Sequence, residues 1–137
     1  MIQKKVNPGK SVLFALIQNG KILCEEREWD GHMMHSIPGG KIEKTDPSQE
    51  AALFREMKEE FDVLPAVFEF IGDIRYNTDE WVFHVWVVTE WEGNVPAINK
   101  EDFRQLSWLD PRMLKDNQYM PGVSDMMRNW FSQRDTE

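Results

Sequence analysis

Residues Gly39–Val63 read GGKIEKTDPSQEAALFREMKEEFDV and carry the strongest structural signal in the chain. The stretch ends in three glutamates at helical positions i, i+3 and i+4, namely Glu56, Glu59 and Glu60. Arg55 comes directly before them. This spacing places three carboxylates on one face of a helix, where they repel one another unless water or a cation screens them. An acidic helix face is usually only solvated, so the neighbouring residues decide whether this one binds a cation.

The same stretch predicts a packed helix with defined ends. Asp46 or Ser48 can cap the exposed amides at its start. On the side opposite the carboxylates, apolar residues recur at spacings of three, three and four, which predicts the core-facing set Ala51, Phe54, Met57 and Phe61. Asp62 stands where the helix must end, in a left-handed conformation that glycine takes most easily.

This segment resembles the Nudix box, whose pattern is Gly, five residues, Glu, seven residues, Arg-Glu-apolar-x-Glu-Glu-x-Gly-apolar. The match starts at Gly40 and reaches Asp46 after five residues, but Asp46 replaces the family Glu. Eight residues rather than seven then separate Asp46 from Arg55, and Asp62 replaces the final Gly. The extra residue falls in the loop 44–49, where an insertion costs little. The Arg-Glu-x-x-Glu-Glu core is intact.

The resemblance implies a magnesium-dependent hydrolase, with Mn²⁺ as an alternative metal. The residues it implies as metal ligands are the Gly40 carbonyl, Glu56, Glu59 and Glu60. The catalytic set that it implies is Arg55, Glu56, Glu59, Glu101 and Asp102. Within that set Arg55 orients the carboxylates by ion pairing. Glu56 is the candidate general base, and Glu101 and Asp102 are the alternative candidates.

Five further residues are candidates for substrate binding: Arg27, Gly39, Lys41, Ser124 and Asp125. Arg27 follows a strand that runs toward the Gly40 turn, and its fork of donors suits a phosphate, although pairing with a neighbouring glutamate is an equal alternative. The Pro38-Gly39-Gly40 turn allows a backbone with positive φ and a carbonyl free to face a cation. Relatives of the MutT type present Asn or Asp to the base near their C-terminus, where this chain offers only Ser124 or Asp125.

The reaction that the resemblance implies is hydrolysis of a nucleoside diphosphate linked to another moiety. A (d)NTP cleaved to the (d)NMP and pyrophosphate is the favoured substrate, and an ADP-ribose or nucleotide-sugar pyrophosphatase is the alternative. A non-catalytic nucleotide-binding regulator is a second alternative. Such regulators usually lose box carboxylates, whereas this chain keeps all three.

Composition is typical of one globular domain over residues 1–137, with 41% hydrophobic residues and no break that suggests a second domain. The net charge of −8 disfavours a nucleic-acid binder. The single cysteine, Cys24, excludes an internal disulfide and favours a reducing compartment. No apolar run approaches a membrane span. We therefore expect a cytoplasmic protein, monomer or homodimer, whose partner is a small nucleotide.

Periodicity predicts strands joined by an Asn19-Gly20 hairpin turn, followed by a loop at Trp29 to Ser36. The predicted strands are Ser11 to Gln18, Lys21 to Glu26, Ala66 to Arg75, Glu80 to Glu90 and Leu106 to Leu109. A terminal helix is predicted at Ser124 to Gln133. This order favours an α/β (α+β) fold, a Nudix-like α/β/α sandwich with a mixed central sheet.

Overall fold

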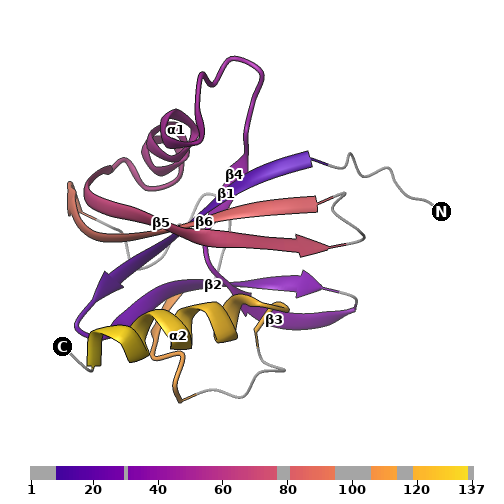
Figure 1. Ribbon diagram of the computed structural model, residues 1–137, viewed down its shortest axis with the longest axis vertical. Coiled ribbons are helices and arrows are strands. Elements are labelled where there is room, and N and C mark those ends of the chain that lie inside the picture. Colours follow the sequence, from indigo (N-terminus) through magenta and orange to yellow (C-terminus); the bar gives the residue numbers. More distant parts are fainter. Residues whose placement is uncertain (1–8, 30, 77–80, 95–105, 114–118, 136–137) are drawn as a thin grey trace.

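The computed structural model describes residues 9–29, 31–76, 81–94, 106–113 and 119–135 (Figure 1). Its strands are β1 (Gly9–Gln18), β2 (Lys21–Trp29), β3 (His32–Ser36), β4 (Gly39–Lys41), β5 (Leu64–Tyr76), β6 (Trp81–Glu92) and β7 (Leu106–Leu109). Its helices are α1 (Gln49–Phe61) and α2 (Val123–Asp135). The predicted strands and terminal helix are confirmed, with bounds shifted by a few residues.

The strands form one mixed sheet in the order β3-β2-β1-β6-β5, with β4 paired to β1 and β7 paired to β2. β1 and β6 run parallel over eight register pairs from Gly9↔Trp81 to Leu16↔Val88, and the other pairings are antiparallel. β1 therefore lies at the centre and links the β4–β6–β5 side to the β2–β3–β7 side. The predicted mixed sheet is confirmed.

Alternate residues of β1 pack into two separate cores, one on each face of the sheet. Val12, Phe14 and Leu16 pack with α1 residues such as Leu53 and Met57. Leu13 and Ala15 pack on the other face, in the cluster that includes Val123, Met127, Trp130 and Phe131 of α2. The two helices thus cover opposite faces of the sheet, as Figure 1 shows with α1 above and α2 below. The predicted α/β/α sandwich is confirmed.

Two local predictions are wrong. The segment 32–36, expected to belong to a loop, is strand β3, which pairs with β2 from Glu25↔Ser36 to Trp29↔His32. Main-chain pairing to a neighbouring strand forms this edge strand although its His and Met side chains have little strand preference. Gly39 and Gly40 have no positive φ, because they form β4 and pair with Leu13 and Val12 of β1.

The ends of α1 follow the sequence closely. Ser48, rather than Asp46, is the N-cap, and its hydroxyl accepts a hydrogen bond from the Ala51 amide at 3.1 Å. Asp62 ends the helix in the left-handed conformation with φ of 57°, and its amide donates to the Lys58 carbonyl. The helix is rotated from the predicted orientation, since it buries Ala52, Leu53, Glu56, Met57 and Phe61. The expected core residues Ala51 and Phe54 are only partly buried.

Within the described ranges, neither helix is both long and apolar enough to cross a membrane. Cys24 is buried in β2, and burial, with a smaller contribution from the charge of Glu25, raises the pKa of its thiol to about 12. The thiol therefore stays protonated near neutral pH and serves as a small apolar side chain of the strand.

Candidate active site

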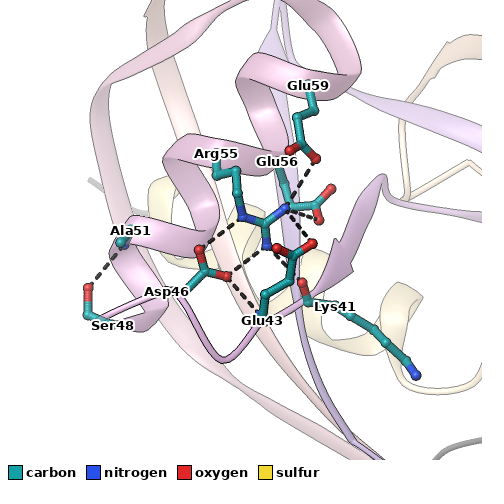
Figure 2. Close-up of polar contacts among 8 residues, drawn as sticks. All are labelled: Lys41, Glu43, Asp46, Ser48, Ala51, Arg55, Glu56 and Glu59. Atoms are coloured by element: carbon teal, nitrogen blue, oxygen red, sulfur yellow. Dashed lines mark hydrogen bonds and ion pairs between the residues drawn. The ribbon is translucent and has the colours of Figure 1, made fainter.

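The guanidinium of Arg55 on α1 is the centre of the polar network at the β4–α1 connection (Figure 2). Its Nε and Nη2 atoms donate to the two carboxylate oxygens of Asp46 at 2.9 and 2.7 Å, and Nη2 also donates to the Lys41 carbonyl at 2.9 Å. Its Nη1 donates to Glu56 Oε2 at 3.0 Å and to Glu59 Oε1 at 3.1 Å. These are five hydrogen bonds, and a guanidinium has five N–H groups, so every N–H group of Arg55 donates to a protein acceptor.

Asp46 is the acceptor that fixes this guanidinium to the loop. Its carboxylate accepts from Arg55 in a bidentate arrangement and also accepts from the Glu43 amide at 2.8 Å. The Asp46 amide in turn donates to the Glu43 carbonyl at 2.9 Å, which closes a tight turn. The capping role considered for Asp46 falls to Ser48.

Glu56 lies under the helix, against the backbone of Gly40. A Cβ atom added to Gly40 would lie 2.3 Å from the carboxyl carbon and from both carboxylate oxygens of Glu56. Only glycine leaves room for the carboxylate at this position, because real Cβ atoms do not approach so closely. Pairing of Gly40 with Val12 holds the strand in place, so the side chain of Glu56 is confined between the helix and the strand.

These contacts shift the proton affinities of the three groups. Hydrogen bonds from Arg55, and then from the Glu43 amide, lower the pKa of Asp46 to about 2. The pKa of Arg55 is raised, chiefly by its hydrogen bonds to Asp46. Burial raises the pKa of Glu56, and the charges of Glu59 and Glu60 add to this, while Arg55 opposes it. Burial therefore favours the protonated form of Glu56 relative to a solvated glutamate, through its raised pKa.

The donor set fits a hard divalent cation in its chemistry. Arg55 supplies one positive charge to four contacting carboxylates, those of Glu43, Asp46, Glu56 and Glu59, which leaves three negative charges uncompensated. Oxygen donors with excess negative charge are what Mg²⁺ and Mn²⁺ prefer. Among the described residues, no three acidic, His or Cys side chains are already gathered at metal-binding geometry. The hydrogen bond from Arg55 holds the Glu59 carboxylate on the guanidinium instead.

The structure brings together some of the predicted site residues and leaves others apart. Arg55, Glu56, Glu59 and Gly40 meet at the Arg55 network, and Glu60 is close enough for its charge to affect Glu56. Lys41 contributes its carbonyl, while its side chain points away from Arg55 (Figure 2). Gly39 lies in β4 against β1, where a Cβ would lie 2.0 Å from the Val12 carbonyl oxygen.

Two of the remaining predicted residues, Ser124 and Asp125, belong to α2 and lie away from this network. Ser124 is buried in the first turn of α2, and Asp125 beside it is exposed and accepts from Arg128 at 3.0 Å. Both are on the face of the sheet opposite α1. Arg27 belongs to β2 and pairs with Met34, and its role in substrate binding stays a prediction. Glu101 and Asp102 lie outside the described residues.

Glu43 is a member of this network that was not predicted from the sequence. Its Oε2 lies 3.5 Å from Arg55 Nη1, the nitrogen that also serves Glu56 and Glu59. The available signal was local, since Glu43 is three residues before Asp46 and a turn of that length brings the two side by side.

Comparison with known proteins identifies the family. The pattern of the NUDIX domain matches residues 7–130. The chain is 30% identical over 105 residues to the CTP pyrophosphohydrolase of Escherichia coli K12, covering 73% of this chain and 75% of the relative. It is 32% identical over 80 residues to the 8-oxo-dGTP diphosphatase of the same organism, covering 56% of this chain and 61% of that relative.

Solved structures share the fold. The solution structure of the E. coli ORF135 protein has a TM-score of 0.72 at 24% identity, covering 93% of this chain and 91% of that one. A MutT NUDIX hydrolase from Burkholderia pseudomallei has a TM-score of 0.71 at 19% identity, covering 88% and 96%.

Fold and sequence together therefore define a pyrophosphohydrolase, an enzyme that cleaves phosphoric anhydrides. The chain belongs to the Nudix family and is MutT-like within it. It acts on small nucleotide substrates in which a nucleoside diphosphate is linked to another group. Nudix hydrolases generally need divalent metal ions.

Replacement of Gly40 by alanine tests the confinement of Glu56. The new methyl group would displace the carboxylate with which it collides, so we expect kcat/KM to fall about 10- to 100-fold if Glu56 takes part in the reaction. The urea midpoint should fall by an amount equivalent to about 1–3 kcal/mol. Glu28→Ala, at an exposed position of β2, is the control. A Gly40→Ala enzyme with the kcat/KM of the wild type would show that activity does not require the confinement of Glu56 by Gly40.

The pair of Asp46 and Arg55 predicts a dependence of stability on pH. A carboxyl whose pKa is lower in the folded state stabilises the fold above its unfolded pKa, and this contribution is lost as the pH falls toward the folded value of about 2. Asp46→Asn should therefore lower the urea midpoint at pH 7, and the difference from the wild type should narrow as the pH falls below about 4. Glu28→Gln, which changes an exposed strand carboxylate, serves as control. A difference independent of pH would exclude the ion pair as its cause.

Proposed function

We propose that this protein hydrolyses a nucleoside triphosphate, (d)NTP, to the monophosphate and pyrophosphate in a reaction that depends on Mg²⁺ or Mn²⁺. The observation that carries the proposal is the set of carboxylates around Arg55, with Glu56 confined by Gly40 and with more negative charge than one guanidinium neutralises. A substrate that carries several phosphates cannot approach such a cluster unless cations lie between them.

The environments of the residues support the roles that we propose for them. Glu56, Glu59, Glu60 and the Gly40 carbonyl would hold the metal ions. When bound there, divalent cations neutralise phosphate charge and lower the pKa of a bound water. Arg55 orients the carboxylates of Glu56 and Glu59 through its Nη1 hydrogen bonds. Glu56, whose pKa is raised by burial, is the candidate base in this part of the site, with Glu101 or Asp102 as its rivals.

The substrate class is supported by the curated relatives. By name, one acts on CTP and the other on 8-oxo-dGTP, and both names describe hydrolysis of a nucleoside triphosphate. The alignment with the first covers about three-quarters of each chain, at 73% and 75%. A structural neighbour described as an ADP compounds hydrolase is only 13% identical, so that likeness reaches no further than the fold. We therefore propose a triphosphate as the substrate rather than ADP-ribose or a nucleotide sugar.

The test is release of pyrophosphate or phosphate from a panel of dNTPs, NTPs, ADP-ribose and nucleotide sugars. We expect pyrophosphate from at least one triphosphate in Mg²⁺ or Mn²⁺ and none in EDTA, because the carboxylates need a cation to accept the phosphate chain. Glu59→Gln should lower kcat/KM by about 100-fold, since it removes a ligand charge. Glu50→Gln, an exposed carboxylate in the first turn of the same helix, is the control. Turnover of ADP-ribose alone, or full activity in EDTA, would overturn the proposal.

A further inference from the structure

We propose that Glu43 is a positioning residue that replaces Glu59 on Arg55 when Glu59 turns to a metal ion. The inference rests on the proposed function for the role of Glu59 as a ligand. Glu43 lies outside the Arg-Glu-x-x-Glu-Glu core, in the loop between β4 and α1, and its carboxylate faces the same guanidinium as the core glutamates (Figure 2).

A count of hydrogen bonds identifies Glu43 as the surplus partner of Arg55. The five N–H groups of the guanidinium are used by five acceptor atoms: two oxygens of Asp46, the Lys41 carbonyl, one oxygen of Glu56 and one of Glu59. Glu43 Oε2 lies 3.5 Å from Nη1, within ion-pair distance, but no N–H group of Arg55 is left to donate to it. A carboxylate in this position takes over a hydrogen bond as soon as another acceptor leaves Nη1.

Exposure shows which acceptor is able to leave. The side chains of Asp46 and Glu56 are 6% and 10% exposed, so both are held in place. Those of Glu59 and Glu43 are each 57% exposed, and both contact Nη1. Glu59 can therefore turn outward without disturbing the core, and Glu43 is equally free to move in. An approach of about 0.5 Å would bring Glu43 from 3.5 Å to an ordinary hydrogen-bond distance.

The exchange matters because Arg55 also holds Glu56. Loss of Glu59 alone would leave one Nη1 hydrogen without a protein acceptor, on a guanidinium whose side chain is only 21% exposed. The turn at Glu43 and Asp46 keeps Glu43 in reach, since each of these residues bonds the other through its amide. With Glu43 on Nη1, Arg55 keeps the same number of bonds and Glu56 keeps its orientation while Glu59 binds the cation.

A double-mutant cycle in EDTA tests the exchange without any metal. In the wild-type background, Glu43→Gln should change the urea midpoint no more than Glu50→Gln does, because Glu43 loses only a 3.5 Å ion pair and no hydrogen bond. In a Glu59→Ala background, where Glu43 has taken the vacant place on Nη1, the same change should raise the unfolding equilibrium constant about two- to fivefold, the size expected of a half-exposed ion pair. Glu50→Gln, in both backgrounds, controls for loss of one negative charge near the helix.

Titration with Mn²⁺ alone, followed by electron paramagnetic resonance, provides the second readout. Glu43→Gln should weaken Mn²⁺ binding about threefold relative to Glu50→Gln, because Glu59 then leaves Arg55 without a replacement. If the two variants weaken Mn²⁺ binding equally, Glu43 acts only through its negative charge near the site, and the inference is wrong. Weaker Mn²⁺ binding without coupling in EDTA would make Glu43 a direct ligand and overturn it too.

The two assays separate this inference from the proposed function. If Glu59→Ala binds Mn²⁺ as well as the wild type, the role of Glu59 as a ligand fails whatever Glu43 does. If Glu59→Ala loses Mn²⁺ binding but Glu43→Gln behaves alike in both backgrounds in EDTA, the proposed function stands and the exchange is wrong.

Discussion

The bidentate pair between Arg55 and Asp46 is the interaction on which the geometry of the site depends. It joins the helix that carries the glutamates to the loop that leads into it, and a third bond from the same guanidinium reaches the Lys41 carbonyl at the end of β4. Because Asp46 uses both oxygens and is only 6% exposed, the plane of the guanidinium is fixed. Nη1 is thereby left facing the carboxylates of Glu56, Glu59 and Glu43, at 3.0, 3.1 and 3.5 Å.

A second constraint acts from the sheet. Parallel pairing of β1 with β6 and antiparallel pairing with β4 place the Gly40 backbone directly beneath α1. Burial of Glu56 against that backbone costs free energy, which is visible in its raised pKa, and the hydrogen bond from Arg55 offsets part of that cost. The site therefore divides into a buried half, with Asp46 and Glu56, and an exposed half, with Glu43 and Glu59. The buried half provides rigidity, and the exposed half is where cations and phosphates can enter.

Much of this arrangement could be predicted from the sequence. The spacing of Glu56, Glu59 and Glu60 placed them on one helix, the left-handed helix end at Asp62 was expected, and alternating strands around the helix indicated the sandwich. Strand β3 was not predicted because it forms by main-chain pairing with β2, and its side chains show no pattern typical of a strand. The role of Asp46 and the presence of Glu43 were missed because both depend on the path of an irregular loop. The rotated face of α1 includes Glu56, which lies against Gly40, and the sequence pattern does not reveal that contact between separate segments.

The most direct test of the central claim is to replace Arg55 by lysine and to measure kcat/KM on the best triphosphate together with the unfolding midpoint. Lysine keeps the positive charge but is a single donor group that cannot bridge Asp46, Glu56 and Glu59 at once. If fixed geometry around the guanidinium organises the site, turnover should fall by about 100-fold or more while the variant still folds. Turnover close to that of the wild type would mean that positive charge alone suffices, and would contradict the account.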